Sequence, residues 1–375
     1  MRVHLADIAH TLTTLGGASP AGAVVAAEFD GDRAIAASGW ALRPTAEHAG
    51  EPMRADMLFD IASVTKVCTT IMLLRLADAG HLDLDAPVRE HLPDMAATIT
   101  AEHLLRHRAG LAAWFPLYTR STDREAALDL AEQLPLAAEP DTVWRYSDIG
   151  MMLLGRLIER ITGTSLQDAF TTLVAEPLHL HRTGWGPVDP RHAAAAADND
   201  DYEYRMIATG KPYPVDAVVS QFQGWRTSTV RGAANDGNTA HALAGCAGHA
   251  GVFSPVDELL TIGGALVDPT FISMGLQTRA LTGTVDAPHQ GLGIRRMTFG
   301  PEHVLVVGHA GFTGTFLGAA VDRPLQVAVA ATRLHGNPPG TAVSTDTIRD
   351  TAIAGILSEI ARAHPNRTPD KGHSQ

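Results

Sequence analysis

Cysteine and lysine are both scarce in this sequence. Cys68 and Cys246 are the only cysteines among 375 residues, too few for the disulfide framework of a small secreted domain. No Cys-x-x-Cys pair or Cys/His cluster with zinc-ligand spacing occurs, so we expect neither a metal ion nor another cofactor. Three lysines and a formal net charge of −12 leave no basic stripe, which argues against nucleic acid and membrane surfaces as partners.

Long hydrophobic runs are also missing. No stretch of about 18 apolar residues is available to span a membrane. His4 and Asp7 interrupt the apolar core that a secretory signal would need near the N-terminus. We therefore expect a cytoplasmic protein. Hydrophobic residues make up 45% of the chain, enough for a large core in one domain or in two interleaved ones, while the oligomeric state is left open.

Strand patterns stand at both ends of the chain, and helical patterns fill its middle. The predicted strands are 23–29, 34–40, 304–307, 315–321 and 326–332, and the predicted helices include 4–16, 63–79, 147–161 and 341–363. Residues 186–240 are rich in Ala, Asp and Gly, and we predict long loops there. The simplest architecture is an α+β fold whose two ends form one antiparallel sheet flanked by helices, with an inserted, mostly helical subdomain.

This architecture predicts a single catalytic domain over residues 1–364. Its sheet lobe would comprise 1–62 and 241–364, its helical lobe 63–240, and a disordered tail would follow at 365–375. Ligand sites favour the cleft between such lobes.

Ser63-Val64-Thr65-Lys66 places a hydroxyl and an amine at i and i+3, on one face of the helix predicted to begin there. A serine hydroxyl is a weak nucleophile that needs a base beside it. Burial among apolar neighbours lowers the pKa of a lysine amine, so Lys66 could be that base. The alternative is a serine that caps the helix and a lysine that extends along its surface.

Two other segments carry groups of the right chemistry. Tyr146 precedes the helix predicted at 147–161, where a phenol near an ammonium could relay a proton, or could simply pack on the helix. The segment 308–315, Gly-His-Ala-Gly-Phe-Thr-Gly-Thr, joins two predicted strands, and its glycines permit close backbone approach to a ligand or merely a tight turn. His309 within it would offer an adjustable charge or a donor.

Two histidines, His103 and His107, have the i, i+4 spacing of zinc ligands. Leu104 stands where a zincin has its glutamate, so we interpret His107 as a loop-bracing residue. No Gly-x-Ser-x-Gly elbow is present, which argues against an α/β-hydrolase.

The segments FDIASVTK, WRYSDIG and GHAGFTGT, in this order and spacing, resemble the serine β-lactamase and penicillin-binding protein superfamily. They are most similar to class C β-lactamases, D-alanyl-D-alanine peptidases and family VIII esterases. By this resemblance Ser63 forms an acyl-enzyme, Lys66 and Tyr146 share the acid and base roles, and Phe312 donates its N–H to the oxyanion. His309, Ala310 and Gly311 occupy the family's Lys-Thr-Gly positions.

Two departures from the family pattern affect the expected substrate. The asparagine of the family's Tyr-x-Asn is Asp148 here, and its carboxylate would hold Lys66 protonated, moving more of the base role to Tyr146. The lysine of Lys-Thr-Gly is His309, which weakens the fixed positive charge that recognises a substrate carboxylate. Both departures argue against efficient β-lactam hydrolysis.

The resemblance implies a serine hydrolase that cleaves a small-molecule ester or amide, and a carboxylesterase-type activity is our first hypothesis. A transacylase that passes the acyl group to an amine or alcohol is the alternative, since sequence does not show whether the pocket admits water or holds an acceptor. A β-lactamase, a D-alanyl-D-alanine peptidase and a non-catalytic binding module are the remaining hypotheses.

Overall fold

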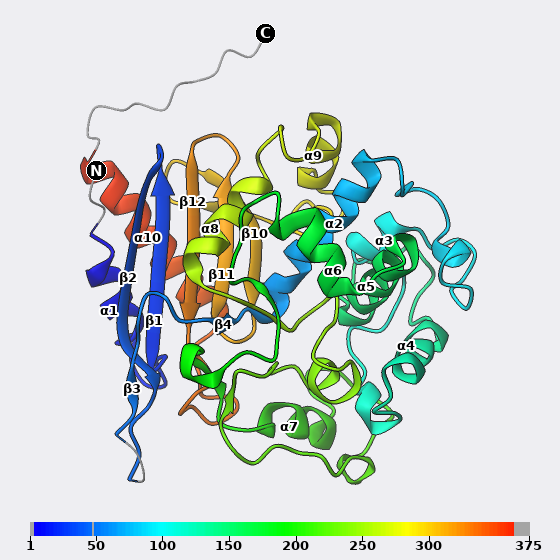
Figure 1. The fold of residues 1–375 in the computed structure, drawn as a ribbon, viewed down its shortest axis with the longest axis horizontal. Helices are drawn as coiled ribbons and strands as arrows, with labels where there is room; N and C mark the ends of the chain where they lie inside the picture. Colours follow the sequence, from blue (N-terminus) through cyan, green and yellow to red (C-terminus); the bar gives the residue numbers. More distant parts are fainter. Residues whose placement is uncertain (1–3, 47–48, 364–375) are drawn as a thin grey trace.

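The computed structural model describes residues 4–46 and 49–363. Seven strands form its main sheet, and every neighbouring pair is antiparallel (Figure 1). In spatial order they are β3 (Glu51–Pro52), β2 (Asp32–Leu42), β1 (Gly22–Phe29), β12 (Leu325–Ala331), β11 (Thr315–Ala320), β10 (Val304–Gly311) and β9 (Arg295–Phe299). Because β1 lies beside β12, the two ends of the chain share one sheet, and the predicted α+β fold is confirmed.

Side chains on β1 alternate between two hydrophobic cores. Val25 and its same-face neighbours Ala23 and Ala27 pack with one cluster, whereas Val24 and Ala26 pack with another. This alternation follows from the two-residue period of a strand. β1, which is apolar except for Glu28 near its end, is therefore buried on both faces.

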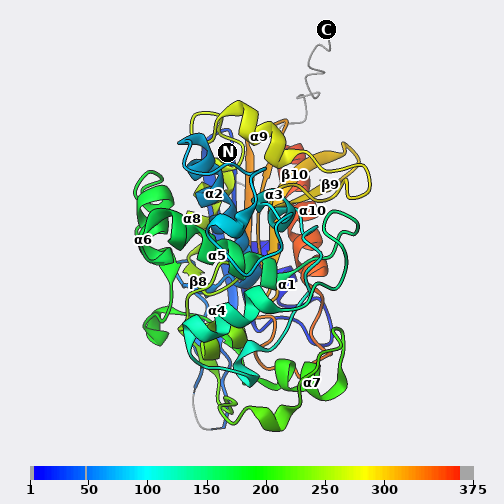
Figure 2. The same cartoon turned by 90° about the vertical axis from the view of Figure 1, so that its right-hand side faces the viewer.

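Helices cover each face of the sheet. On one face lie α1 (Ala6–Leu12) and α10 (Thr345–Ala363), and on the other lies α8 (Val256–Ala265) (Figure 1). Beyond α8 the larger core continues into α2 (Thr65–Asp78), α3 (Ala101–Leu105), α4 (Arg124–Gln133), α5 (Asp148–Thr162) and α6 (Leu166–Phe170). Figure 2 looks onto this helical part, with α7 (Asp201–Thr209) apart from it at one end.

Short strands connect the helical part to the sheet. They are β4 (Phe59–Asp60), β8 (Val252–Ser254) and β5 (Gly184–Trp185) in one three-stranded sheet, and β6 (Ala195–Ala197) with β7 (Val230–Arg231) in another. One further helix, α9 (Met274–Leu281), lies in the C-terminal third. Within the described ranges, no helix is long and apolar enough to cross a membrane.

Several predicted boundaries need correction. The loop prediction for 186–240 is wrong where α7, β6 and β7 form. The acidic residues in the first turn of α7 and the left-handed Gly210 that ends it are sequence signals of a helix. The last helix begins at Thr345 rather than at 341, because the Ser344 hydroxyl accepts the Thr347 N–H and caps it. The first helix is shorter than 4–16, and β9 was not predicted because this polar edge strand lacks alternation.

The predicted boundaries of the two lobes remain a prediction. The predicted disordered tail at 365–375 lies outside the described residues.

Candidate active site

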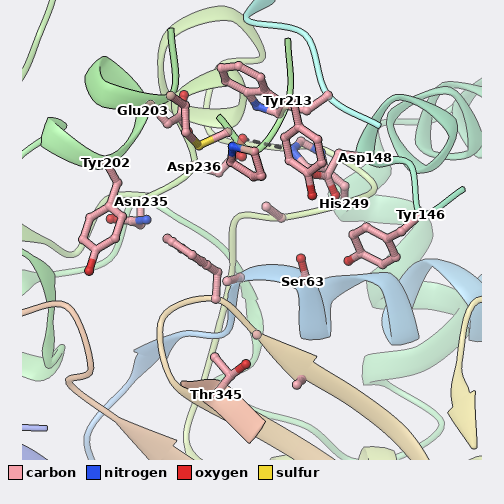
Figure 3. Close-up of a pocket in the computed structure, with 18 of the residues that line it drawn as sticks. Ser63, Tyr146, Asp148, Tyr202, Glu203, Tyr213, Asn235, Asp236, His249 and Thr345 are labelled. Carbon is pink, nitrogen blue, oxygen red and sulfur yellow. Dashed lines mark hydrogen bonds and ion pairs between the residues drawn. The ribbon is translucent and has the colours of Figure 1, made fainter. Parts of the chain in front are cut away.

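Ser63 lies in a strained turn immediately before α2. Ala62 has a φ of 46°, and residues Ala62–Val64 form one 3-10 turn. A positive φ at a non-glycine residue is costly and persists only where the surroundings enforce it. Here the Asp60 carboxylate accepts the Ala62 N–H at 2.8 Å. In Figure 3 the Ser63 side chain consequently projects from the start of α2 into open space.

Lys66 is fully buried, and polar groups from several segments surround its ammonium. Nζ donates to Ser63 Oγ at 2.8 Å and to the His249 backbone carbonyl at 3.2 Å, and it lies 2.7 Å from Asp148 Oδ1. Burial by itself lowers a lysine pKa, but the Asp148 carboxylate and the Tyr146 phenol outweigh it, so the pKa of Lys66 is raised. At rest Lys66 is therefore an ammonium.

Tyr146 lies within hydrogen-bond reach of both residues. Its phenol hydrogen-bonds with the Lys66 amine and the Ser63 hydroxyl, and the ammonium is 5.0 Å from its ring centroid. Burial raises the phenol pKa, and the Lys66 charge opposes that rise. His107 packs against the ring with centroids 4.7 Å apart, and its Nδ1 accepts the Ser147 N–H, so it braces the turn that presents Tyr146.

Close packing of α5 explains how a phenol so distant in sequence reaches Ser63. The Ser147 side chain caps α5, which places Tyr146 just before the helix and Asp148 in its first turn. Farther along, Gly155 lies against Gly248, where an added Cβ would be 2.2 Å from the Met151 carbonyl. Thr69 of α2 donates to the Gly248 carbonyl at 2.7 Å, so this segment is packed between the two helices.

The turn after β10 faces the nucleophile. Thr313 Oγ1 donates to the Asp60 carbonyl at 2.8 Å and Thr315 Oγ1 to the Ile61 carbonyl at 2.9 Å, which ties this turn to that of Ser63. Gly311 makes the approach possible, since a Cβ there would be 2.4 Å from the Ile61 carbonyl. Within the described chain the N–H groups of Ser63 and Phe312 have no acceptor. Two unpaired N–H groups beside a serine hydroxyl are the donors that an oxyanion needs.

His309 is almost completely buried and is uncharged. Burial, followed by the Lys66 and Arg295 charges, lowers its pKa to about 3. Its Nδ1 lies 2.7 Å from the Ala310 carbonyl, which can only accept, so Nδ1 carries the proton. Nε2 then has only a lone pair, and no partner for it exists in the described structure. His309 is thus an acceptor rather than the adjustable charge or donor that the sequence suggested.

Arg295 supplies the positive charge that His309 lacks. It lies on β9 opposite Gly308, and its guanidinium stacks 4.8 Å from the Trp144 centroid and 5.5 Å from that of Tyr146. No carboxylate or hydrogen-bond acceptor pairs with this guanidinium among residues 4–46 and 49–363. Sequence analysis missed Arg295 because β9 was not recognised, and the argument that the site lacks a cation does not hold.

A cavity of about 930 Å³ opens above Ser63. Segment 199–213, inside the stretch predicted as loops, forms much of its wall, together with Asn235 and Asp236. Trp114, Trp144 and Tyr213 add aromatic surface, and the cavity also contains Asp148, His309 and Phe312. All seven residues singled out from the sequence therefore lie at or beside one cavity: Ser63, Lys66, Tyr146, Asp148, His309, Gly311 and Phe312.

Metal ligands are not grouped in the part of the chain that the structure describes: no three His, Cys, Asp or Glu side chains are placed to hold an ion.

The sequence of this chain is similar to those of known proteins. The family profile described as Beta-lactamase matches residues 10–349. An N-acetylmuramyl-L-alanine amidase of Bacillus subtilis is 29% identical over 299 residues, which cover 70% of this chain and 65% of that protein. Esterase EstB of Burkholderia gladioli is 36% identical over 182 residues, covering 42% of this chain and 46% of the esterase. The chain thus matches less than two thirds of the length of either relative.

Solved structures show the same fold. The D-amino acid amidase from Ochrobactrum anthropi SV3, solved with D-phenylalanine, superposes with a TM-score of 0.72 at 20% sequence identity. The alignment covers 94% of this chain and 98% of the amidase.

Proposed function

Since the chain belongs to the beta-lactamase family of serine hydrolases, we propose that it hydrolyses a small ester or amide through an acyl-enzyme on Ser63, with carboxylesterase-type activity as the first candidate. One observation carries the proposal. The Ser63 hydroxyl lies 2.8 Å from the Lys66 amine, and the Tyr146 phenol bonds to both, at the base of a cavity. A nucleophile, a base and a proton donor in mutual contact are the minimal set for acyl transfer.

The reaction follows from these contacts. Ser63 Oγ attacks the substrate carbonyl carbon while its proton passes to Tyr146 or Lys66, whichever of the pair has lost its own proton. The oxyanion that forms lies between the N–H groups of Ser63 and Phe312. The same pair then protonates the leaving group as its bond to the carbonyl carbon breaks. Water repeats the sequence on the acyl-enzyme and frees Ser63.

Proton balance decides which residue acts as the base. Lys66 is an ammonium beside Asp148, and burial keeps Tyr146 a neutral phenol. In the resting site neither residue can accept the Ser63 proton, so one of them must first lose its own. Loss of that proton generates a phenolate that the ammonium stabilises, or a neutral amine beside the phenol. The rate of acylation should therefore rise with pH.

Transfer to an acceptor is the second candidate, and the size of the cavity favours it. About 930 Å³ lies near the upper end of the range for small-molecule sites, which leaves room for an acyl group and an acceptor together. A β-lactamase or D-alanyl-D-alanine peptidase would need a fixed cation for the substrate carboxylate. His309 does not provide it, although Arg295 supplies a charge one strand away.

Intact-protein mass spectrometry with p-nitrophenyl esters tests the proposal. An acyl adduct should form on Ser63 and should be absent from Ser63→Ala. Added amines or alcohols that speed release and form new esters or amides would indicate transfer rather than hydrolysis. If no ester, amide or β-lactam acylates the wild-type protein, a binding module would be the better interpretation.

Location in the cytoplasm is part of this proposal. The two thiols, Cys68 and Cys246, are both free, as expected in a reducing compartment. Cell fractionation of the native host, with antibody detection, would check it.

A further inference from the structure

The carboxylates that line the active-site cavity differ in their partners. Asp148 pairs with Lys66, Asp200 with Arg226, and Asp346 with Arg349, at 2.6 to 2.7 Å. Glu203 and Asp236 complete the set, and within the described ranges neither has a lysine or arginine partner. After these pairs are accounted for, Glu203 and Asp236 are the carboxyl groups of the cavity that no lysine or arginine neutralises in the described residues.

Both carboxylates are held rigidly. Glu203 accepts the Tyr118 hydroxyl at 2.7 Å and the Gly237 N–H at 2.6 Å. Gly237 permits this approach, because an added Cβ would be 2.2 Å from Glu203 Oε2. Asp236 accepts the Thr239 N–H at 2.7 Å through Oδ1. Carboxylates fixed in this way are pre-organised, as a ligand site requires.

His249 connects this pair to the nucleophile. Its Nε2 lies 2.9 Å from Asp236 Oδ1, and its backbone carbonyl accepts the Lys66 ammonium. The side chain is only 1% exposed, yet no group in the described structure bonds to its Nδ1. An ionised Asp236 carboxylate can only accept, so Nε2 carries the proton of this bond, and in the uncharged form of the ring Nδ1 is a lone pair that can accept from a ligand. Figure 3 shows Glu203, Asp236 and His249 along one wall of the cavity, with Ser63 across from them.

We propose that Glu203, Asp236 and the Nδ1 of His249 form an ammonium subsite, which holds a protonated amine carried by the acyl group of the substrate. The inference rests on the proposed function. An ammonium has three N–H donors, as many as the acceptors that this wall presents. The leaving group takes its proton from the Tyr146 side, and in Figure 3 Glu203 lies on the side of the cavity away from Tyr146, so we assign the subsite to the acyl group.

The electrostatics of the empty wall agree with a cationic ligand. Burial, followed by the Asp236 charge, raises the pKa of Glu203 to about 8. Two neighbouring buried carboxylates repel each other and lose hydration when both are charged. A bound ammonium relieves both costs and ionises Glu203.

Matched esters measure the subsite directly. We would compare kcat/KM for methyl esters of straight-chain ω-amino acids, from glycine to 6-aminohexanoate, with alkanoate methyl esters of the same length. The wild-type enzyme should prefer the amine-bearing ester by about tenfold or more at one chain length, because a buried charge pair discriminates at least that strongly. N-acetylation of the amine should remove the preference.

Two variants and a control complete the test. Glu203→Gln and Asp236→Asn should each lower the preference ratio about tenfold or more, whatever they do to the absolute rates. Glutamine keeps both Glu203 bonds, since its carbonyl accepts the Gly237 N–H and its amide donates to the Tyr118 oxygen. Asp346→Asn removes a carboxylate from the same cavity, but one that Arg349 already neutralises, so the ratio should not change.

A ratio near one at every chain length, or a ratio that the two variants leave unchanged, would overturn the subsite. Loss of the preference on addition of EDTA would also overturn it, because the wall would then hold a metal ion. Acylation of Ser63 by p-nitrophenyl acetate separates the two claims. If it succeeds while the ratio is one, only the subsite fails; if no ester acylates Ser63, the proposed function fails.

Discussion

Asp148 should determine the acid limb of the pH–rate profile. Its carboxylate lies 2.7 Å from the Lys66 ammonium and raises the pKa of Lys66 and also that of Tyr146. Whichever of the two is the base, it gives up its proton less readily because Asp148 is charged. The change Asp148→Asn removes the charge and keeps an oxygen that can accept from Nζ, so the geometry of the site should survive.

The magnitude follows from the separation and the burial. Two unit charges 2.7 Å apart attract by about 6 kcal/mol at an effective dielectric constant of about 20. Lys66 is fully buried, but the Asp148 side chain is 20% exposed, so solvent weakens the interaction. A carboxylate this close to a cation shifts a pKa by about one to three units in proteins. The acid limb should move to lower pH by about that much.

The assay is kcat/KM for a p-nitrophenyl ester between pH 5 and pH 10, with wild-type, Asp148→Asn and Asp346→Asn enzymes. On the acid limb the Asp148 variant should be faster than wild type by about tenfold for each pH unit of displacement. The Asp346 variant should keep the wild-type limb. A limb that stays in place or moves to higher pH would refute the reasoning, because the proton would then leave a group that Asp148 does not influence.

Three further perturbations have directions that the structure determines. Tyr146→Phe keeps the ring against His107 but removes the phenol, and kcat should fall by about 10²–10⁴-fold with little change in the melting temperature. Gly311→Ala places a methyl 2.4 Å from the Ile61 carbonyl, so it should displace the turn and slow acylation about tenfold or more. Gly275→Ala, in α9, should not slow acylation, because its methyl would meet no atom within 4 Å and its backbone has no positive φ. Glu203 has a folded-state pKa of about 8 against 4.5, so the folded protein binds the extra proton in that window. As the pH rises from 4.5 to about 8, the free energy of unfolding of wild type should therefore fall by about 1.4 kcal/mol per pH unit relative to that of Glu203→Gln. Urea unfolding of both proteins across this pH range measures the difference.

Local chemistry in the sequence was enough to identify much of the molecule. A Ser-x-x-Lys pair at the start of an apolar segment implies a nucleophile and an amine on one helix face, since i and i+3 are neighbours on any helix. Short apolar runs typical of strands located β1 and β12, and capping residues located α5, as with Ser147 and Gly163 at its ends. These features depend on residues that are close together in the sequence, so they can be predicted without knowledge of the tertiary structure.

The charge states of the site depended on contacts between distant segments. Burial among apolar neighbours would favour a neutral Lys66, whereas the family resemblance implies that Asp148 holds its proton, and the structure supplies that contact from another helix. His309 looked chargeable, but burial and Lys66 remove its proton, while Arg295 on an unrecognised edge strand brings the cation. Glu203 and Asp236 belong to residues 186–240, for which the sequence predicted only long loops. Sequence alone therefore determined which groups could react, whereas only the tertiary structure decided their protonation and partners, because electrostatic energies depend on burial and on distances between residues far apart in the chain.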